Sequence, residues 1–334
     1  MKHQPRAALP IVLPLITLIA AACSSGSGSP TGAGGTTGQT TGTEAGTTTT
    51  GSAGTGGAST SSGSGAGTGG GDIACKGSDY SDPNAPKVKI GTVSAKIVDL
   101  MGNPAPSDFS VQVCGTNLCF YGKAGMTLGQ FAVIGSPTPL QQPLFKFGDA
   151  RNYAKLGIPV TAAKLDAMGN ETFATLTTAA LPANGPVIAP GTTITSGEVT
   201  LTLPVGGVAV VDESIYPDPV DQQLRAVTIP IVKAPEVLAA APAGIEQLYG
   251  VGPLETVFCP AAMVTVPNAD VVKWPAGTDV EFWILGLDGA SQEWAPYGGW
   301  QKVSDGKVSA DGKTISTGAS GLPLLSTFGI RKKP

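Results

Sequence analysis

The sequence predicts an all-β protein made of antiparallel β-sandwich modules, two in number, that follow a disordered tether. Of its 334 residues, 47 are glycine, 28 are proline and only 13% are charged, whereas charged residues make up about 25% of a typical soluble protein. Short stretches such as residues 109–113 alternate apolar and polar side chains, which is the period of a half-buried strand. Residues 24–71 are mostly Gly, Thr, Ser and Ala, a composition that cannot bury enough apolar surface to fold.

The first 22 residues are typical of a secretory signal. Lys2 and Arg6 precede an apolar run over residues 7–22, which is shorter than the roughly 20 residues that a bilayer-spanning helix needs. The run ends in Ile19-Ala-Ala-Ala-Cys23 and resembles the lipobox of bacterial lipoproteins, although alanine stands at position 20, where leucine is commonest. The resemblance implies that Cys23 is lipidated (the palmitate of a membrane anchor) after residues 1–22 are removed. The alternative is a plain signal peptide cut after residue 22.

Serine rather than aspartate follows the predicted anchor cysteine, at position 24. In Gram-negative lipoproteins an aspartate there is associated with retention in the inner membrane. The resemblance therefore implies an exported protein that is anchored in the outer membrane, at the cell surface or on the periplasmic face.

The histidine count excludes several kinds of catalytic site. The chain has one histidine, His3, which lies inside the predicted signal and is lost with it. Ser-His-Asp and Cys-His nucleophile pairs need an imidazole base, and typical catalytic zinc sites use histidine ligands. The net charge is −4 and the lysines are scattered, so the chain lacks the clustered basic residues of a nucleic-acid-binding protein. We expect no cofactor and no enzymatic activity.

Four cysteines remain beside Cys23, namely Cys75, Cys114, Cys119 and Cys259. An even number in an exported chain favours two disulfides, which can be connected in three ways. Cys114 and Cys119 flank a Gly-Thr-Asn-Leu segment that suits a hairpin turn, so we predict that they pair with each other and that Cys75 pairs with Cys259 by elimination. The rival interpretation, a metal site, lacks any CxxC spacing.

Composition divides the exported chain into four segments: a linker with the lipidated cysteine (23–72), a first β-sandwich portion (73–136), a β-rich middle region (137–257) and a C-terminal β-rich module (258–334). The best candidates for short helices are residues 235–240 and 245–249. Pro230 predicts an edge strand or a bulge at residues 226–232. The Asp-Gly pairs at 305–306 and 311–312 are the strongest hairpin signals in the chain.

Two stretches resemble known modules. Gly91-Thr-Val93, Asp99, Gly102-Asn-Pro104, Val111-Gln-Val113 and Gly129-Gln-Phe131 resemble the carboxypeptidase regulatory-like, or transthyretin-like, β-sandwich. Gly125 and Met126 stand where that family commonly has a Thr-Asp pair. The resemblance implies a seven-stranded Greek-key sandwich and no peptidase activity. Residues 275–282 together with 308–312 resemble β-rich closing modules of uncharacterised bacterial surface lipoproteins and have a similar look to the β-sandwich shared by ankyrins and netrin receptors.

Two groups of residues are candidates for ligand sites. Asp212, Glu213, Asp218 and Asp221 form an acidic stretch whose carboxylates could hold calcium or supply the acid and base of a glycosidase. The spacing is not that of an EF-hand, and a solvated loop is the simpler interpretation. Tyr297 and Trp300 lie in a turn-rich segment and could stack on a sugar, although structural roles in a core outweigh that interpretation.

The sequence therefore predicts a membrane-anchored, non-catalytic envelope lipoprotein that acts as a surface binding, adhesion or structural module. Its expected partners are the membrane, through the lipid, and a glycan or an envelope protein, but no nucleic acid. The first alternative is an accessory subunit of an envelope complex that faces the periplasm. The second is a hydrolase that depends on carboxylates alone.

Overall fold

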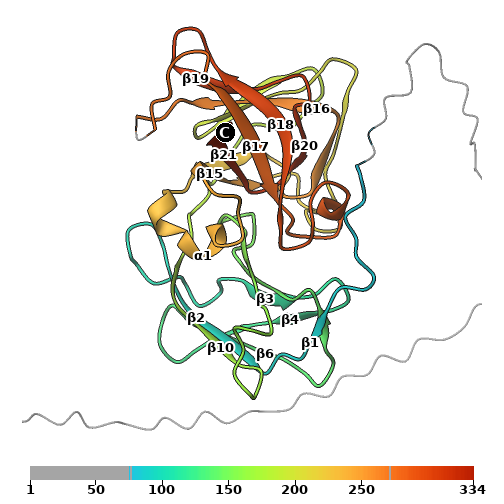
Figure 1. Cartoon of the computed structure of the whole chain (residues 1–334), viewed down its shortest axis with the longest axis vertical. Coiled ribbons are helices and arrows are strands. Elements are labelled where there is room, and N and C mark those ends of the chain that lie inside the picture. The colour runs from blue at the N-terminus through green and yellow to red at the C-terminus, as the bar shows by residue number, and fades with distance from the viewer. Residues whose placement is uncertain (1–74, 76, 271) are drawn as a thin grey trace, which may run out of the picture. The chain divides into compact units, whose positions relative to one another are not determined.

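A computed structural model describes residues 75, 77–270 and 272–334 of the chain. The predicted signal, the lipidation site at Cys23 and the linker to residue 72 lie outside the described residues. The described part is almost entirely β-structure, which confirms the predicted fold class. Within it, no helix is both long and apolar enough to cross a bilayer. Figure 1 shows the strands of the N-terminal half in blue to green and those of the C-terminal half in yellow to red.

Two four-stranded sheets form the N-terminal half, which we call the sandwich. One has the order β10-β2-β6-β5 and the other β4-β3-β8-β9, with the pair β1-β7 beside them. Their bounds are β1 Lys87–Val88, β2 Thr92–Val98, β3 Val111–Cys114, β4 Cys119–Tyr121, β5 Lys123–Ala124, β6 Gln130–Ile134, β7 Leu140–Gln141, β8 Leu144–Phe147, β9 Leu156–Pro159 and β10 Glu171–Thr177. Strand β10 pairs with β2 in parallel, while the other strand pairs of the described residues are antiparallel.

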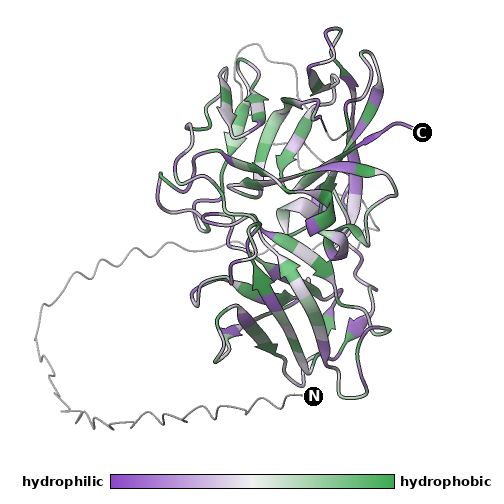
Figure 2. Ribbon diagram, turned by 90° about the vertical axis from the view of Figure 1, so that its left-hand side faces the viewer, coloured by the Kyte–Doolittle hydropathy of each residue, from purple (hydrophilic) through white to green (hydrophobic). Residues whose placement is uncertain are grey.

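Aromatic side chains fill the space between the two sheets of the sandwich. The rings of Phe145 on β8 and Phe173 on β10 stack with their centroids 5.3 Å apart, and Phe109 contacts Phe131 of β6 at 5.6 Å. Along β2 and β6 buried residues alternate with less buried ones, as expected for strands with one face in a core. Figure 2 shows the corresponding alternation of hydrophobic and hydrophilic segments along the strands.

The C-terminal half is a single connected sheet of eleven strands, which we call the large sheet. Its main order is β11-β12-β16-β19-β18-β17-β21-β15-β14, and β13 and β20 also pair with β16. The bounds are β11 Thr193–Ser196, β12 Val199–Thr202, β13 Val208–Val210, β14 Arg225–Thr228, β15 Ile245–Gly252, β16 Thr256–Pro267, β17 Asp279–Leu285, β18 Trp300–Val308, β19 Thr314–Thr317, β20 Leu322–Leu325 and β21 Phe328–Lys332. The short helices are α1 (Pro235–Leu238), η1 (Ile231–Lys233) and η2 (Ala290–Glu293).

The two end strands of the large sheet, β11 and β14, approach each other. The backbone N–H of Ala226 on β14 donates a 3.1 Å hydrogen bond to the Ser196 hydroxyl at the end of β11. The Thr228 hydroxyl likewise bonds to the Glu198 carboxylate. Pro230 follows β14 and has no N–H with which to extend the ladder. The edge of β14 is therefore not paired with another strand of the described residues, and the side chains of Ser196 and Glu198 cover part of it.

Three sequence predictions of local structure are corrected or sharpened. Residues 245–249 form strand β15 and not a helix, whereas the other helix candidate contains α1. The Asp305-Gly306 pair lies inside β18 and makes no turn, because Gly306 pairs with strands on both sides. Only glycine fits there, since a Cβ would come within 2.5 Å of the Phe282 ring. The second pair does form the β18–β19 turn, with Gly312 at φ +71°.

Both predicted cysteine pairs lie within disulfide distance. The Cα atoms of Cys114 and Cys119 are 4.0 Å apart across the β3–β4 hairpin. Those of Cys75 and Cys259 are 5.3 Å apart and join the start of the described chain to β16. The chain passes from the sandwich to the large sheet between β10 and β11, near residue 180. The predicted middle region therefore contributes strands to both.

Candidate ligand groove

An apolar groove of about 1000 Å³ lies along the edge of the large sheet. One wall comes from the sandwich, through Leu100 and residues 180–182. The other comes from residues 226–232 of β14 and η1 and from residues 245–249 of β15, with Ala269 and Val272 beside them. The volume is at the upper end of the roughly 300–1000 Å³ of typical small-molecule pockets, which are also mainly apolar.

Local sequence explains why this edge stays open to the groove. Strand β14 is only four residues long, and Pro230 and η1 turn the chain away directly after it. The backbone N–H of Ile229 still bonds to Leu248 at 2.8 Å, so this side of the strand is paired. Val232, which follows on η1, is 84% exposed in the groove wall.

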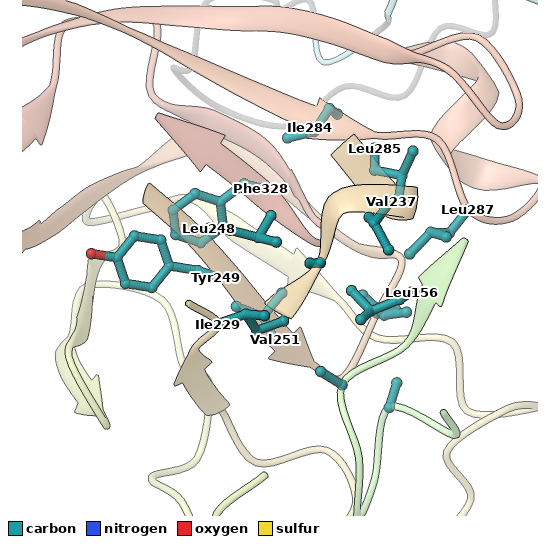
Figure 3. Packing of buried hydrophobic residues seen from close by; sticks show 14 of the residues in the cluster. Leu156, Ile229, Val237, Leu248, Tyr249, Val251, Ile284, Leu285, Leu287 and Phe328 are labelled. Atoms are coloured by element: carbon teal, nitrogen blue, oxygen red, sulfur yellow. The ribbon is translucent and has the colours of Figure 1, made fainter. Parts of the chain in front are cut away.

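Strand β15 places two polar side chains together in this wall. Gln247 and Tyr249 are two residues apart and therefore lie on the same face of the strand. The Tyr249 hydroxyl donates a 2.7 Å hydrogen bond to Oε1 of Gln247, and its ring stacks on Phe328 of β21 at 4.9 Å. Figure 3 shows the Tyr249 ring beside Phe328 with its hydroxyl pointing away from the apolar cluster. Burial, with a smaller contribution from Glu198, raises the pKa of Tyr249, so the phenol remains a donor.

The amide nitrogen of Gln247 is the unusual atom of the groove. Gln247 is 4% exposed, and its Nε2 is buried without any hydrogen-bond partner. A buried donor without a partner costs roughly 1–3 kcal/mol. Gln247 is one of the lining residues of the groove, so its unpartnered donor belongs to the groove wall.

The charged residues of the groove lining are both acidic. Glu198 and Glu246 line it, and each is exposed. These two residues, which we call the groove rim, add negative charge to a lining that is otherwise mostly apolar.

A second cluster of polar groups, which we call the ionic junction, lies where the sandwich meets the large sheet. Lys146 of β8 is 2% exposed. Its ammonium pairs with Asp288 and lies 5.0 Å from the centre of the Tyr297 ring. Lys155 contacts the other carboxylate oxygen of Asp288 at 2.8 Å. Burial opposes ionisation of Asp288, but the two ammoniums hold its pKa below the ordinary value.

Glu255 is the remaining acidic group of the junction. It is 5% exposed, and its Oε2 accepts a 2.8 Å hydrogen bond from the backbone N–H of Ser291. Burial, and then the charge of Asp288, raises its pKa to about 7. Glu255 and Asp288 do not line the apolar groove, so these titrating groups are separate from the surface where a ligand would bind.

The four acidic residues considered for calcium do not converge. Asp212 accepts hydrogen bonds from the N–H and hydroxyl of Ser214, and Asp218 accepts one from the N–H of Val220. Asp221 faces Arg151 and Arg225 at 3.4 and 3.6 Å, and Glu213 is exposed. Among the described residues, no three His, Cys, Asp or Glu side chains are placed to hold a metal ion.

The two aromatic residues considered for sugar stacking are buried. Tyr297 and Trp300 are each 7% exposed. The Tyr297 hydroxyl donates to the Cys114 carbonyl at 3.3 Å, and its ring faces Lys146. These contacts leave little ring surface for a sugar.

Sequence reasoning missed both the groove and the junction. Gln247 and Tyr249 would point in different directions on the helix predicted for residues 245–249, and only the strand brings them together. Comparison of the chain with known protein families, with curated proteins and with solved structures gives no match.

Proposed function

We propose that this chain is a membrane-anchored, non-catalytic envelope lipoprotein that acts as a binding module, and that the apolar groove is its binding site. The observation that carries the proposal is the buried, unpartnered donor of Gln247 in an apolar wall. An unpartnered buried donor destabilises the folded chain, and a bound molecule with an acceptor would satisfy this one.

The anchor and the linker support the same proposal from the sequence. Lipidation of Cys23 would attach the chain to a membrane. The 48 residues from 24 to 71, mostly Gly, Thr, Ser and Ala, lie between Cys23 and the described fold in the sequence. Such a tether suits a module that binds at a distance from its anchor.

The test of location is protease treatment of intact cells that carry an epitope after Pro334, with a Cys23→Ser variant as the control for anchoring. Loss of the epitope while the cells stay sealed supports a surface-exposed binding module. Survival of the epitope until the outer membrane is opened contradicts the surface location and supports the accessory subunit facing the periplasm.

A further inference from the structure

We propose that the groove binds an uncharged amphiphile, a molecule with an elongated apolar body and one hydrogen-bond acceptor oxygen that is held by Gln247. The inference rests on the proposed binding function and names the chemical class of its ligand. Three properties of the groove select this class: its apolar walls, its one unpartnered donor and the sign of its charges.

The apolar walls select the body of the ligand. Leu181, Ile229, Ile231 and Val232 line the groove together with backbone and aliphatic parts of β15. Each Å² of apolar surface that a ligand buries here contributes about 25 cal/mol to the favourable free energy of transfer from water. A strongly polar ligand such as an oligosaccharide would lose hydration without matching partners in these walls.

The amide selects an acceptor on the ligand. The Tyr249 hydroxyl donates a 2.7 Å hydrogen bond to Oε1 of Gln247. This bond orients the amide and leaves Nε2 as the donor without a partner. This nitrogen is closed to water. To reach a carbonyl or ether oxygen of the ligand, the amide must rotate about its terminal torsion, which is broad for amides, and the Tyr249 hydroxyl must move with Oε1 to keep its hydrogen bond.

The charges disfavour an anionic head group, and a cationic head group offers no acceptor to the amide. Glu198 and Glu246 are the charged residues of the groove lining, and both repel a carboxylate or a phosphate. An alkylammonium would be attracted to them, but it brings no acceptor for the buried N–H. An uncharged ester, amide or alcohol meets both requirements.

The experiment compares three twelve-carbon probes by isothermal titration calorimetry, below their critical micelle concentrations and at pH 8. The probes are glycerol monolaurate, laurate and dodecyltrimethylammonium. The protein is the mature chain with Cys23→Ser, which lacks the lipid. We expect the ester to bind at one site and about threefold more tightly than laurate, because laurate carries a charge that the two exposed glutamates repel.

Variants assign the binding to the groove. Ala180 is exposed and lines the groove, so Ala180→Trp should abolish binding of the ester. Ala124→Trp makes the same change at an exposed position of β5 outside the lining and should leave binding unchanged. The double variant Gln247→Leu/Tyr249→Phe keeps the groove apolar and should weaken the ester about fivefold, as expected for one lost hydrogen bond, while dodecyltrimethylammonium should not be weakened.

Three outcomes would overturn the proposal. One is the absence of ester binding by the folded protein, and another is equal affinity of the three probes regardless of Ala180→Trp. The third is a dimer that Ala180→Trp dissociates, which would make the groove a contact between two copies of the chain. None of these measurements depends on where the protein is located, so they can fail while the protease test of the anchored protein succeeds.

Discussion

The groove and the ionic junction both join the sandwich to the large sheet, but they leave different kinds of buried polar atom without a partner. In the junction, Asp288 meets two ammoniums, and Glu255 accepts a backbone hydrogen bond at Oε2 while its Oε1 has no partner. In the groove, the atom without a partner is the amide nitrogen of Gln247. Glu255 can take up a proton, and its pKa is raised to about 7, whereas an amide N–H cannot titrate. The difference therefore separates a junction of charged side chains from a concave apolar surface with a fixed donor, which is the kind of surface that a ligand occupies.

The largest expected effect comes from breaking the junction. Asp288→Ala leaves Lys146 and Lys155 close together, largely buried and without their shared counter-charge. We expect the free energy of unfolding to fall by about 3–5 kcal/mol, measured by urea denaturation. Asp305→Ala is the matched control, since this carboxylate is 56% exposed in its ion pairs with Lys302 and Lys333, and it should cost less than about 1 kcal/mol. Equal losses in the two variants would contradict a structural role for the junction.

Titration of Glu255 should make the stability of the protein depend on pH. Its pKa is about 7 in the folded chain, against an ordinary value of 4.5 for a glutamate side chain, so folding favours the protonated form. The stabilisation that the protonated Glu255 adds to the free energy of unfolding is fully present below pH 4.5 and is lost as the pH rises to 7. Glu255→Gln removes the titration, and the variant should gain about 2–4 kcal/mol relative to the wild type between pH 4.5 and pH 8.

Denaturation of both proteins at several pH values measures this gain. The difference between them reports on Glu255, because the pKa of Asp288 is held below its ordinary value and Asp288 stays ionised from pH 4.5 to pH 8. A difference that stays constant from pH 4.5 to pH 8 would show that Glu255 is ionised in the folded protein across this range.

Removing the polar pair of the groove should stabilise the unliganded protein slightly. Gln247→Leu/Tyr249→Phe eliminates the unpartnered donor and the hydroxyl that bonds to the same amide. We expect the free energy of unfolding to rise by about 1 kcal/mol. Tyr249→Phe alone should lower it, because it leaves the amide oxygen without its donor as well. A loss of several kcal/mol in the double variant would mean that the pair serves the fold and not a ligand.

The smallest effect is expected at the groove rim. Glu198→Gln/Glu246→Gln changes two exposed carboxylates, so the free energy of unfolding should stay within about 0.5 kcal/mol of the wild type. Binding of laurate should tighten about threefold, because the repulsion between exposed charges is modest in water. Titration of laurate into both proteins measures this change. Unchanged laurate affinity would remove the charge argument for an uncharged ligand.

Local sequence was sufficient to predict the β-fold and several of its parts. The period-two pattern of residues 109–113 predicted a strand where β3 lies. Glycine and asparagine between Cys114 and Cys119 predicted a hairpin that brings these cysteines together. Pro230 predicted an edge strand, and β14 ends the main order of the large sheet. Each of these features depends on residues that are close in the sequence.

Features that depend on distant residues could not be predicted in this way. Residues 245–249 are short and of mixed polarity, and their pairing with β14 and β21 decides that they form a strand. Gly306 resembles a turn residue until the Phe282 ring is placed against it. Lys146 and Asp288 are 142 positions apart in the sequence. Local propensity carries no information about such contacts, so only the tertiary structure decided the ionic junction and the candidate groove.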